Sequence, residues 1–279
     1  MLSRVIRLAL VVVVSVLTIV SLSCEGAPDA PEYDNPIIPG DPSYVPPQTT
    51  ILSGPVEGAV VDSHAVTFTW VGNQDGMTFS YRLNEVRWSY WATDTTTTFQ
   101  YLDEGDYLFQ VRGQYTSGVI EDTAASSGFT VDDIHGPALW LYPRYQDVDV
   151  GSEFSLEVML EEVENVFAVK VVLGFDPTAL QVSNIEVYED SRSLLKANGG
   201  TVIPFSSYDN TAGSVTCAVA TATGAPPGVS GTGAVARVTF SMTGPGETLI
   251  SFRASSSFRD PDNQDISLNE TVHGMVGVQ

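Results

Sequence analysis

The sequence has few of the residues from which metal centres and catalytic dyads are usually built. It contains two cysteines and three histidines in 279 residues, and His64, His135 and His273 stand singly in separate parts of the chain. This set allows neither a disulfide framework nor a cysteine-based metal site, and no G-x-S-x-G elbow is present. Paired carboxylates carry no information in a chain with 34 acidic residues. We therefore expect no enzyme and no resident cofactor.

Positive charge is also scarce, with 12 Lys and Arg against 34 Asp and Glu and a net charge of −22. A surface of this charge repels nucleic acid and anionic lipid head groups, so neither is an expected partner. The acidic residues are spread through the chain rather than gathered in a tail. We interpret them mainly as solubilising, although such a surface also suits cations such as calcium.

The chain has no apolar run of the roughly 20 residues that cross a bilayer. The apolar stretch from Leu8 to Leu22 follows Arg4 and Arg7 and ends at a small residue. A basic start, an apolar centre and a small residue before the cut are typical of a secretory signal. We therefore predict a signal peptide over residues 1–23.

Cys24 lies where the cut is expected, and this resembles a bacterial lipoprotein signal. The resemblance implies a lipidated Cys24 and an extracytoplasmic protein anchored to the cell envelope, at the outer membrane or cell surface. Lasting attachment needs more than one acyl chain. Ser21 stands where such signals usually have an aliphatic residue. An ordinary cleaved signal and an uncleaved anchor are the alternatives.

The next segment, residues 24–49, is rich in proline and acidic residues, with seven prolines. Helices and sheet interiors do not tolerate this density of proline. We expect an extended, semi-rigid linker that reaches up to about 80 Å at roughly 3.1 Å per residue.

From Ile51 onward, apolar residues recur at period two in short runs, as in half-buried antiparallel strands. Gly, Asn and Asp separate these runs, and no helical stripe appears. We predict an all-β sandwich over residues 50–132. The expected strands are Val66–Trp70, Thr78–Leu83, Thr97–Leu102 and Tyr107–Tyr115.

The spacing of Leu102, Gly105 and Tyr107 is that of a tyrosine corner, in which the phenol hydrogen-bonds back to the chain before its strand. Together with Trp70 on an early strand, it resembles a fibronectin type III module of the immunoglobulin-like class. The resemblance covers residues 50–132 and implies a spacer or adaptor without catalysis.

The segment Arg87-Trp-Ser-Tyr-Trp91 offers two interpretations. Trp88 and Trp91 could form an aromatic platform that stacks on sugar rings. Alternatively, they fold over the edge of the sandwich as part of its packing, which we favour because aromatic pairs at this place fit the module.

A second all-β sandwich is predicted over residues 137–279, after the acidic pair Asp132-Asp133 and Gly136-Pro137. Cys217 lies on one of its alternating runs and is expected to be a buried small apolar residue. The expected strands are Ala138–Pro143, Phe154–Leu160, a strand opening the segment Phe167–Val182, Ser214–Thr221, Ala234–Met242 and Thr248–Ser255.

The segment Phe167–Val182 separates its residues into two faces, because side chains two apart share a face of a strand. One face is expected in the core and consists of Phe167, Val169, Val171, Leu173 and Phe175. Burying five such side chains stabilises by roughly 8–15 kcal/mol before entropy is subtracted. The other face carries small residues and one charge, which suits contact with another surface; an ordinary solvated sheet is the alternative. This outward face consists of Ala168, Lys170, Val172 and Gly174.

Five segments of the second half carry a further resemblance: Val148–Val166, Phe175–Val182, Gly213–Ala220, Gly228–Phe240 and Arg259–Leu268. They are similar to cohesin domains and occur in that family's order across about 140 residues. This resemblance implies a nine-stranded jelly-roll sandwich that binds a dockerin, a small calcium-loaded helical module carried by enzymes and other extracellular proteins. It also implies a role in polysaccharide degradation, with calcium on the partner rather than on this chain.

The resemblance places partner contacts on the outward face and also shows a departure. First-type cohesins present an Asn and an Asp eight and six residues before the Asp of the Asp-Pro turn. Here Ala168 and Lys170 occupy these positions before Asp176. The polar pair is missing and one charge is inverted, so either a divergent dockerin docks more hydrophobically or the partner has changed. Asp176 itself is expected to be structural, accepting hydrogen bonds from the amides after it.

Two further patterns resemble ligand motifs without their context. Gly231-Thr-Gly-Ala-Val-Ala236 has the spacing of a dinucleotide fingerprint but leads into a strand rather than a helix, so we predict a bend. The loop Asp260–Asp265 lacks the glycine and the final Glu of an EF-hand. We expect an acidic hairpin tip there, with a weak calcium site as the alternative.

The sequence thus predicts an envelope-anchored, non-catalytic binding protein with a fibronectin-like spacer and a cohesin-like receptor. Two alternatives are direct carbohydrate binding, through the second sandwich or through Trp88 and Trp91, and a structural or adhesive lipoprotein that assembles through its flat sheet.

Overall fold

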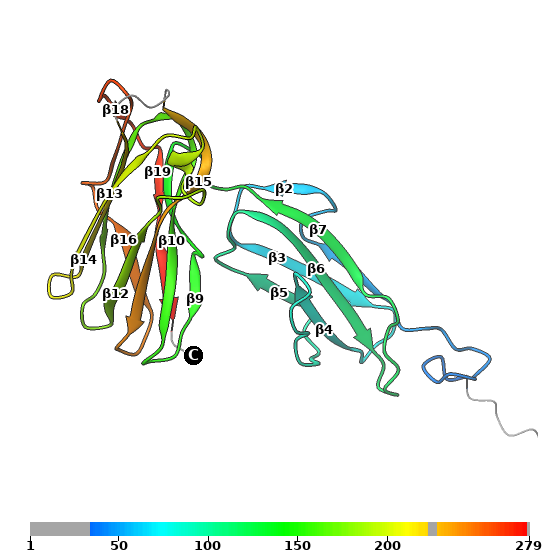
Figure 1. Cartoon of the computed structure of the whole chain (residues 1–279). Helices are drawn as coiled ribbons and strands as arrows, with labels where there is room; N and C mark the ends of the chain where they lie inside the picture. The colour runs from blue at the N-terminus through cyan, green and yellow to red at the C-terminus, as the bar shows by residue number, and fades with distance from the viewer. Residues whose placement is uncertain (1–33, 223–227, 278–279) are drawn as a thin grey trace, which may run out of the picture.

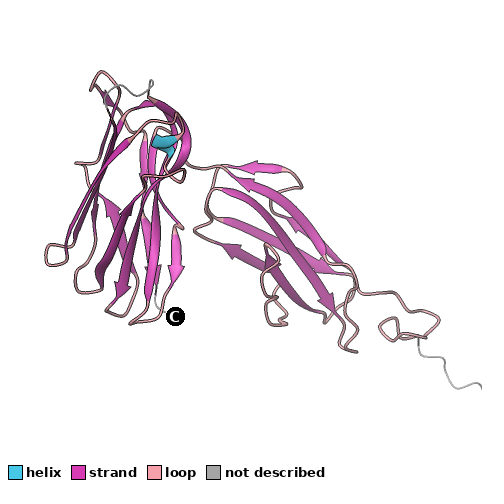
Figure 2. Ribbon diagram, in the orientation of Figure 1, coloured by secondary structure: helices cyan, strands magenta, loops and turns pink. Residues whose placement is uncertain are grey.

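The protein is described by a computed structural model covering residues 34–222 and 228–277. The predicted signal peptide, Cys24 and the first part of the proline-rich linker lie outside the described residues. Within them the chain is almost entirely β-structure in two sandwiches, with one 3₁₀ turn, η1 (Leu194–Lys196) (Figures 1 and 2). This confirms the predicted all-β fold. No helix in the described ranges is long and apolar enough to cross a membrane.

The first sandwich packs a sheet of order β1-β3-β5 against a sheet of order β2-β7-β6-β4. All neighbours are antiparallel except β2 and β7, which run parallel. Its strands are β1 (Thr49–Ser53), β2 (Ala59–Val61), β3 (Val66–Gly72), β4 (Thr78–Leu83), β5 (Thr96–Phe99), β6 (Gly105–Gln114) and β7 (Ala125–Val131).

The core between these sheets is aromatic because the alternating strands place their large rings on the inner faces. Phe68 of β3 stacks on Phe109 of β6 with 3.9 Å between ring centroids, and both are fully buried. The tyrosine corner is confirmed, since the Tyr107 hydroxyl donates to the Asp103 carbonyl at 3.1 Å. This bond fixes the loop between β5 and β6, which also contacts the second sandwich.

The described part of the linker corrects the expectation of an extended spacer. Residues 34–48 form turns that lie against the end of the first sandwich, with Ile37 and Tyr44 packed on its core. The Ser117 hydroxyl donates to the Ile37 carbonyl at 2.7 Å, and the Tyr115 hydroxyl donates to the Val45 carbonyl at 2.9 Å. The free energy gained by packing apolar residues on the core exceeds the conformational entropy that the segment loses by folding back.

The second sandwich contains a five-stranded sheet of order β12-β15-β10-β8-β19 and an eight-stranded sheet whose main path is β13-β14-β11-β16-β20-β9, with β17 and β18 attached at β11. Its strands are β8 (Ala138–Tyr142), β9 (Tyr145–Asp147), β10 (Glu153–Val166), β11 (Ala168–Gly174), β12 (Leu180–Val187), β13 (Val202–Asp209), β14 (Ser214–Thr221), β15 (Val229–Met242), β16 (Thr248–Phe252), β17 (Ser257–Arg259), β18 (Asp265–Ile266), β19 (Glu270–Val272) and β20 (Gly274–Gly277).

The strands predicted from period-two runs are all present, and β14 has the predicted bounds. Between the sheets lies one continuous apolar core to which β10, β11, β14 and β15 contribute alternate residues. Gly231 has a φ of +121° and lies within β15, where the register against β10 shifts. The glycine pattern therefore serves a bend in a strand, as predicted, and begins no helix.

The two sandwiches meet at Arg144, in the loop between β8 and β9. Its side chain is only 4% exposed. Nη1 donates to Asp133 Oδ2 at 2.9 Å, Nη2 donates to Glu104 Oε1 at 3.1 Å, and the backbone N–H donates to Asp103 Oδ1 at 2.7 Å. Next to it, Tyr145 stacks on Tyr101 of the first sandwich, with centroids 5.3 Å apart. One guanidinium thus holds two carboxylates from outside its own sandwich. We call this cluster the Arg144 joint.

Burial and competition for Arg144 separate the pKa values of the two carboxyls. Burial raises the pKa of Glu104 to about 7, and its hydrogen bond with Asp133 acts in the same direction. Burial also acts to raise the pKa of Asp133, but hydrogen bonds from Arg144 and Glu104 outweigh it and lower that pKa to about 2. At neutral pH, Asp133 is therefore the charged partner of Arg144.

Replacing Arg144 by Ala should loosen the joint, because Asp133 would stay charged without its guanidinium partner. Breaking a buried pair from one side costs about 3 kcal/mol. We expect a lower melting temperature by calorimetry and a wider spread of inter-sandwich orientations by small-angle scattering. The control is Arg192→Ala, since Arg192 is half-exposed and pairs with Glu186 and Asp190 inside its own sandwich. An unchanged scattering profile for Arg144→Ala would contradict the role of the joint.

The raised pKa of Glu104 predicts a pH-dependent stability. Between about pH 4.5 and about pH 7 the folded chain keeps a proton that the unfolded chain has released, so the free energy of unfolding falls as pH rises through this window. Glu104→Gln keeps the acceptor but cannot ionise. The melting temperature of the wild type minus that of Glu104→Gln should therefore fall from about pH 5 to about pH 8. A constant difference would show that Glu104 does not titrate in this window. The pKa shift of Asp133 acts only below about pH 4.

Candidate docking surface

Strand β11 places its residues on two faces, as its alternation predicts. Val169, Val171 and Leu173 are at most 2% exposed and belong to the core. Phe175, just after the strand, is also buried. Phe167, before the strand, is only half-buried, which corrects the expected five-residue stripe to four. Ala168 and Val172 are half-buried and Lys170 is exposed on the opposite face.

The register extends this outward face over the neighbouring strands. Ala168 pairs with Ala220 of β14, and Ala220 pairs with Ile203 of β13. One step along, Lys170 pairs with Ala218, and Ala218 pairs with Phe205. Residues opposite each other in a ladder share a face. Two rows of side chains therefore cross three strands on the outside of the sandwich.

On the other side of β11, the same rows continue to β17. Arg259 pairs with Ala168, and Ser257 pairs with Lys170. Ile203 and Phe205 are 61% and 58% exposed, and between them and β11 the surface is hollowed by about 300 Å³. We call this surface the docking face; it consists of Ala168, Lys170, Ile203, Phe205, Ala218, Ala220, Ser257 and Arg259.

The docking face lies at the end of its sheet away from the joint. β13 is the last strand of the sheet order, whereas β9, beside Arg144, is at the opposite end. Figure 1 shows β13 and β14 on the side of the second sandwich that faces away from the first. The first sandwich therefore leaves this surface open.

The outward face of β11 ends at Val172 and does not include Gly174. A Cβ at Gly174 would lie 2.7 Å from Arg253 Nε, and Gly174 is buried beneath this guanidinium. The expectation that Gly174 belongs to the exposed face is therefore corrected. Val172 is partly covered, since its N–H donates to the Ser256 hydroxyl at 2.9 Å.

Ile203 and Phe205 are absent from the sequence predictions because their strand was not predicted. Pro204 interrupts the run, and a proline argues against a central strand. β13 is an edge strand, where proline is tolerated, and it pairs along its whole length with β14. The signal that could have revealed it is the alternation of Val202, Pro204 and Ser206 with Ile203 and Phe205.

Trp88 and Trp91 are half-buried, and guanidinium groups lie over their rings. Arg112 lies 4.2 Å from the centroid of Trp88 and 5.3 Å from that of Trp91, and Arg82 lies 4.5 Å from that of Trp88. Cation–π pairs of this kind stabilise a surface. The arrangement supports the packing interpretation over an open sugar platform.

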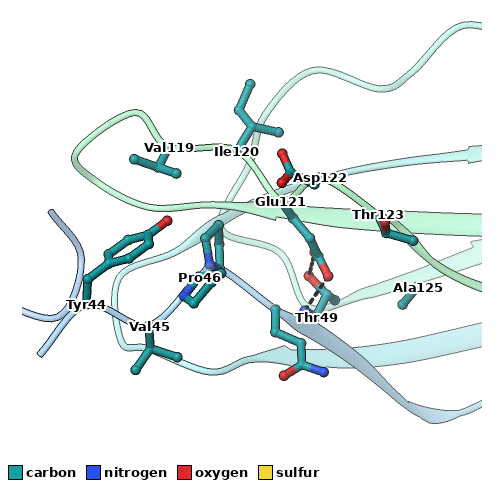
Figure 3. Close-up of a pocket in the computed structure, with 12 residues that line it drawn as sticks. Tyr44, Val45, Pro46, Thr49, Val119, Ile120, Glu121, Asp122, Thr123 and Ala125 are labelled. Atoms are coloured by element: carbon teal, nitrogen blue, oxygen red, sulfur yellow. Dashed lines mark hydrogen bonds between the residues drawn. The ribbon is translucent and has the colours of Figure 1, made fainter. Parts of the chain in front are cut away.

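A hollow of about 670 Å³ lies where the linker meets the first sandwich (Figure 3). Its buried acid, Glu121, is already satisfied. Oε1 accepts from the Thr49 N–H at 2.9 Å, and Oε2 accepts from the Thr49 hydroxyl at 2.6 Å and the Gly113 N–H at 2.8 Å. Both carboxylate oxygens are thus hydrogen-bonded within the sandwich, and Glu121 fastens β1 to β6.

The remaining sequence candidates are structural in character. Cys217 is buried in the core, and burial raises the pKa of its thiol to about 12. The Asp176 carboxylate accepts from the Thr178 N–H at 2.8 Å, the turn role that was predicted. Asp260 and Asp265 flank the β17–β18 hairpin, where the Asp260 carboxylate accepts from the Gln264 N–H at 2.7 Å. Across the described residues, no cluster of three or more His, Cys, Asp or Glu could hold a metal ion.

Comparison with solved structures finds cohesins. A non-cellulosomal cohesin from Archaeoglobus fulgidus is 15% identical, with 51% of this chain and 90% of that chain covered and a TM-score of 0.41. The seventh ScaB type I cohesin from Pseudobacteroides cellulosolvens is 18% identical, with 51% and 91% covered and a TM-score of 0.41. The third cohesin of ScaC from Acetivibrio cellulolyticus, solved with the ScaB dockerin, is 17% identical, with 50% and 97% covered and a TM-score of 0.42.

A search of curated proteins gave no match. The model of the Cohesin domain family matches residues 144–278, which begin at the joint and include every strand of the docking face. This confirms the family resemblance for the second half of the sequence. Residues 144–278 of this chain are therefore a cohesin domain.

Proposed function

We propose that the docking face binds a dockerin-bearing extracellular protein, without chemistry on this chain. The observation that carries the proposal is the face itself. It presents exposed Ile203 and Phe205 beside small alanines, on strands held rigid by the core beneath. Cohesin domains are non-catalytic modules for protein–protein interaction, which agrees with such a surface.

The residues favour a partner that contacts the face through apolar side chains. Ala218 and Ala220 leave room above β14, while Phe205 forms a wall at the edge. Buried aromatic and aliphatic anchors in such hollows supply most of the binding energy at interfaces. The Asn and Asp of first-type cohesins are replaced by Ala168 and Lys170, so the partner is a divergent dockerin. Calcium would be carried by that dockerin.

Two alternatives, direct sugar binding and self-assembly, can be distinguished from dockerin binding. The rings of Trp88 carry guanidinium groups, which leaves the sugar platform without a supporting observation. Assembly of this chain with itself through the docking face would appear in sedimentation as a mass that increases with concentration. Dockerin binding would leave the free chain monomeric.

We place the protein at the bacterial cell envelope, tethered through Cys24 and acting in polysaccharide degradation. The basis is the N-terminal pattern of Arg4, Arg7 and Cys24 together with the cohesin domain. In this arrangement the first sandwich is a spacer that keeps the docking face clear of the membrane.

The tether predicts a fractionation result. Cys24→Ser should move the protein from the membrane fraction to the soluble fraction, because no thiol would remain to accept a diacylglycerol. Immunoblotting of separated fractions measures this, and Cys217→Ser is the control because Cys217 is buried in the core. Retention of Cys24→Ser in the membrane would point to an uncleaved anchor.

The docking face predicts a binding result with a matched pair of variants. Phe205→Ala should weaken dockerin binding about tenfold, since an aromatic anchor at an interface contributes about 1.4 kcal/mol or more. Calorimetry against dockerin modules encoded in the same genome, with and without calcium, measures it. The control is Tyr208→Ala, because Tyr208 is 50% exposed on the same strand but on its other face.

Both variants should melt within about 1 °C of the wild type, since neither residue is in the core. Equal affinity of Phe205→Ala and the wild type would place the interface elsewhere. Absence of binding to every dockerin would overturn the proposed function.

A further inference from the structure

We infer that the partner carries a carboxylate which pairs with Lys170 on the docking face. This inference rests on the proposed docking function and specifies the chemistry of the partner at the docking face.

The use of positive charge across the described residues gives the first argument. Ten of the 12 Lys and Arg lie within them, since Arg4 and Arg7 do not. Nine of these ten contact a carboxylate, an amide or carbonyl oxygen, or an aromatic ring, whereas Lys170 has no such contact among the described residues. The nine are Arg82, Arg87, Arg112, Arg144, Arg192, Lys196, Arg237, Arg253 and Arg259.

The composition of the docking face gives the second argument. In a chain with 34 acidic residues, none of the residues that line the hollow is acidic. Its other cation, Arg259, is already paired with Asp265 at 3.1 Å and donates to the Asn263 carbonyl. Lys170 is therefore the one uncompensated charge on this surface.

The position of Lys170 gives the third argument. It lies on β11 between Ala218 of β14 and Ser257 of β17, both too short to cover its ammonium. Phe205 stands one strand beyond Ala218 in the same row. A partner that covers Ile203 and Phe205 must also remove water from Lys170. Burying an unpaired ammonium costs several kcal/mol, which a carboxylate in contact with it offsets.

The rest of the chain limits the charge of the partner. A net charge of −22 repels a partner that is acidic overall. The carboxylate is therefore a local feature, one Asp or Glu among apolar and neutral residues of the dockerin helix that covers the docking face, which we call the contact helix. A partner with a neutral residue there loses the pair, and one with Lys or Arg there is rejected.

The test uses two copies of a dockerin module that differ only at the centre of the contact helix, with Asp in one and Asn in the other. Calorimetry measures both against the full chain in detergent. The Asp probe should bind the wild type at least tenfold more tightly than the Asn probe. Lys170→Met, which keeps the length but not the charge, should abolish this preference.

Lys170→Glu should reverse the preference, so that the Asn probe binds more tightly. Arg87→Glu is the matched control, because it makes the same charge change on an exposed arginine of the first sandwich, which lies over the ring of Tyr90. It should leave the preference for the Asp probe unchanged.

The outcomes separate this inference from the proposed function. If both probes bind the wild type with equal affinity, or if Lys170→Met keeps the preference, the carboxylate pairing is wrong and dockerin docking stands. If neither probe binds, docking itself fails. A preference that also disappears in Arg87→Glu would assign the effect to net charge rather than to Lys170.

Discussion

The period of β11 is the constraint from which the docking face follows. Val169, Val171 and Leu173 must lie in the core, so the residues between them must point outward. A slip of one residue would bury the charge of Lys170 and expose three apolar side chains. The core therefore fixes where Lys170 stands, and the ladder with β14 and β13 adds Ala218 and Phe205 in the same row. The buried residues of β11 therefore determine which side chains form the docking face.

The few positively charged side chains of this protein have specific partners within the chain. Arg144 joins two sandwiches, Arg112 covers tryptophan rings, and Arg237 pairs with Glu157. Each position has a structural explanation within the chain. Among the Lys and Arg of the described residues, Lys170 is the exception, and it lies on the docking face with the exposed Ile203 and Phe205. The partner carboxylate that we infer would give this unpaired charge its counter-ion.

Much of the fold could be predicted from the sequence, because alternation reports directly on one-sided burial. The strand from Ser214 to Thr221 was predicted with its bounds, and the Tyr107 corner followed from spacing alone. The misses have physical causes. β13 is an edge strand whose Pro204 weakens the pattern, and Gly174 is covered by Arg253, which is distant in sequence. The linker folds back because Ile37 and Tyr44 find apolar surface, a tertiary effect that proline content does not report. Of the eight residues of the docking face, only Ala168 and Lys170 were predicted, because the other six lie on strands that the tertiary fold brings beside β11.

The joint also determines how the protein can be divided. A cut between residues 133 and 137 would remove Asp103, Glu104 and Asp133 from Arg144, together with the ring of Tyr101 that covers Tyr145. In the excised cohesin half, the guanidinium of Arg144 would lack its carboxylate partners and the ring of Tyr145 would be exposed. Its solubility and melting temperature would then reflect the newly exposed joint surface rather than the intrinsic properties of the cohesin domain. Biochemical work should therefore use the two sandwiches together.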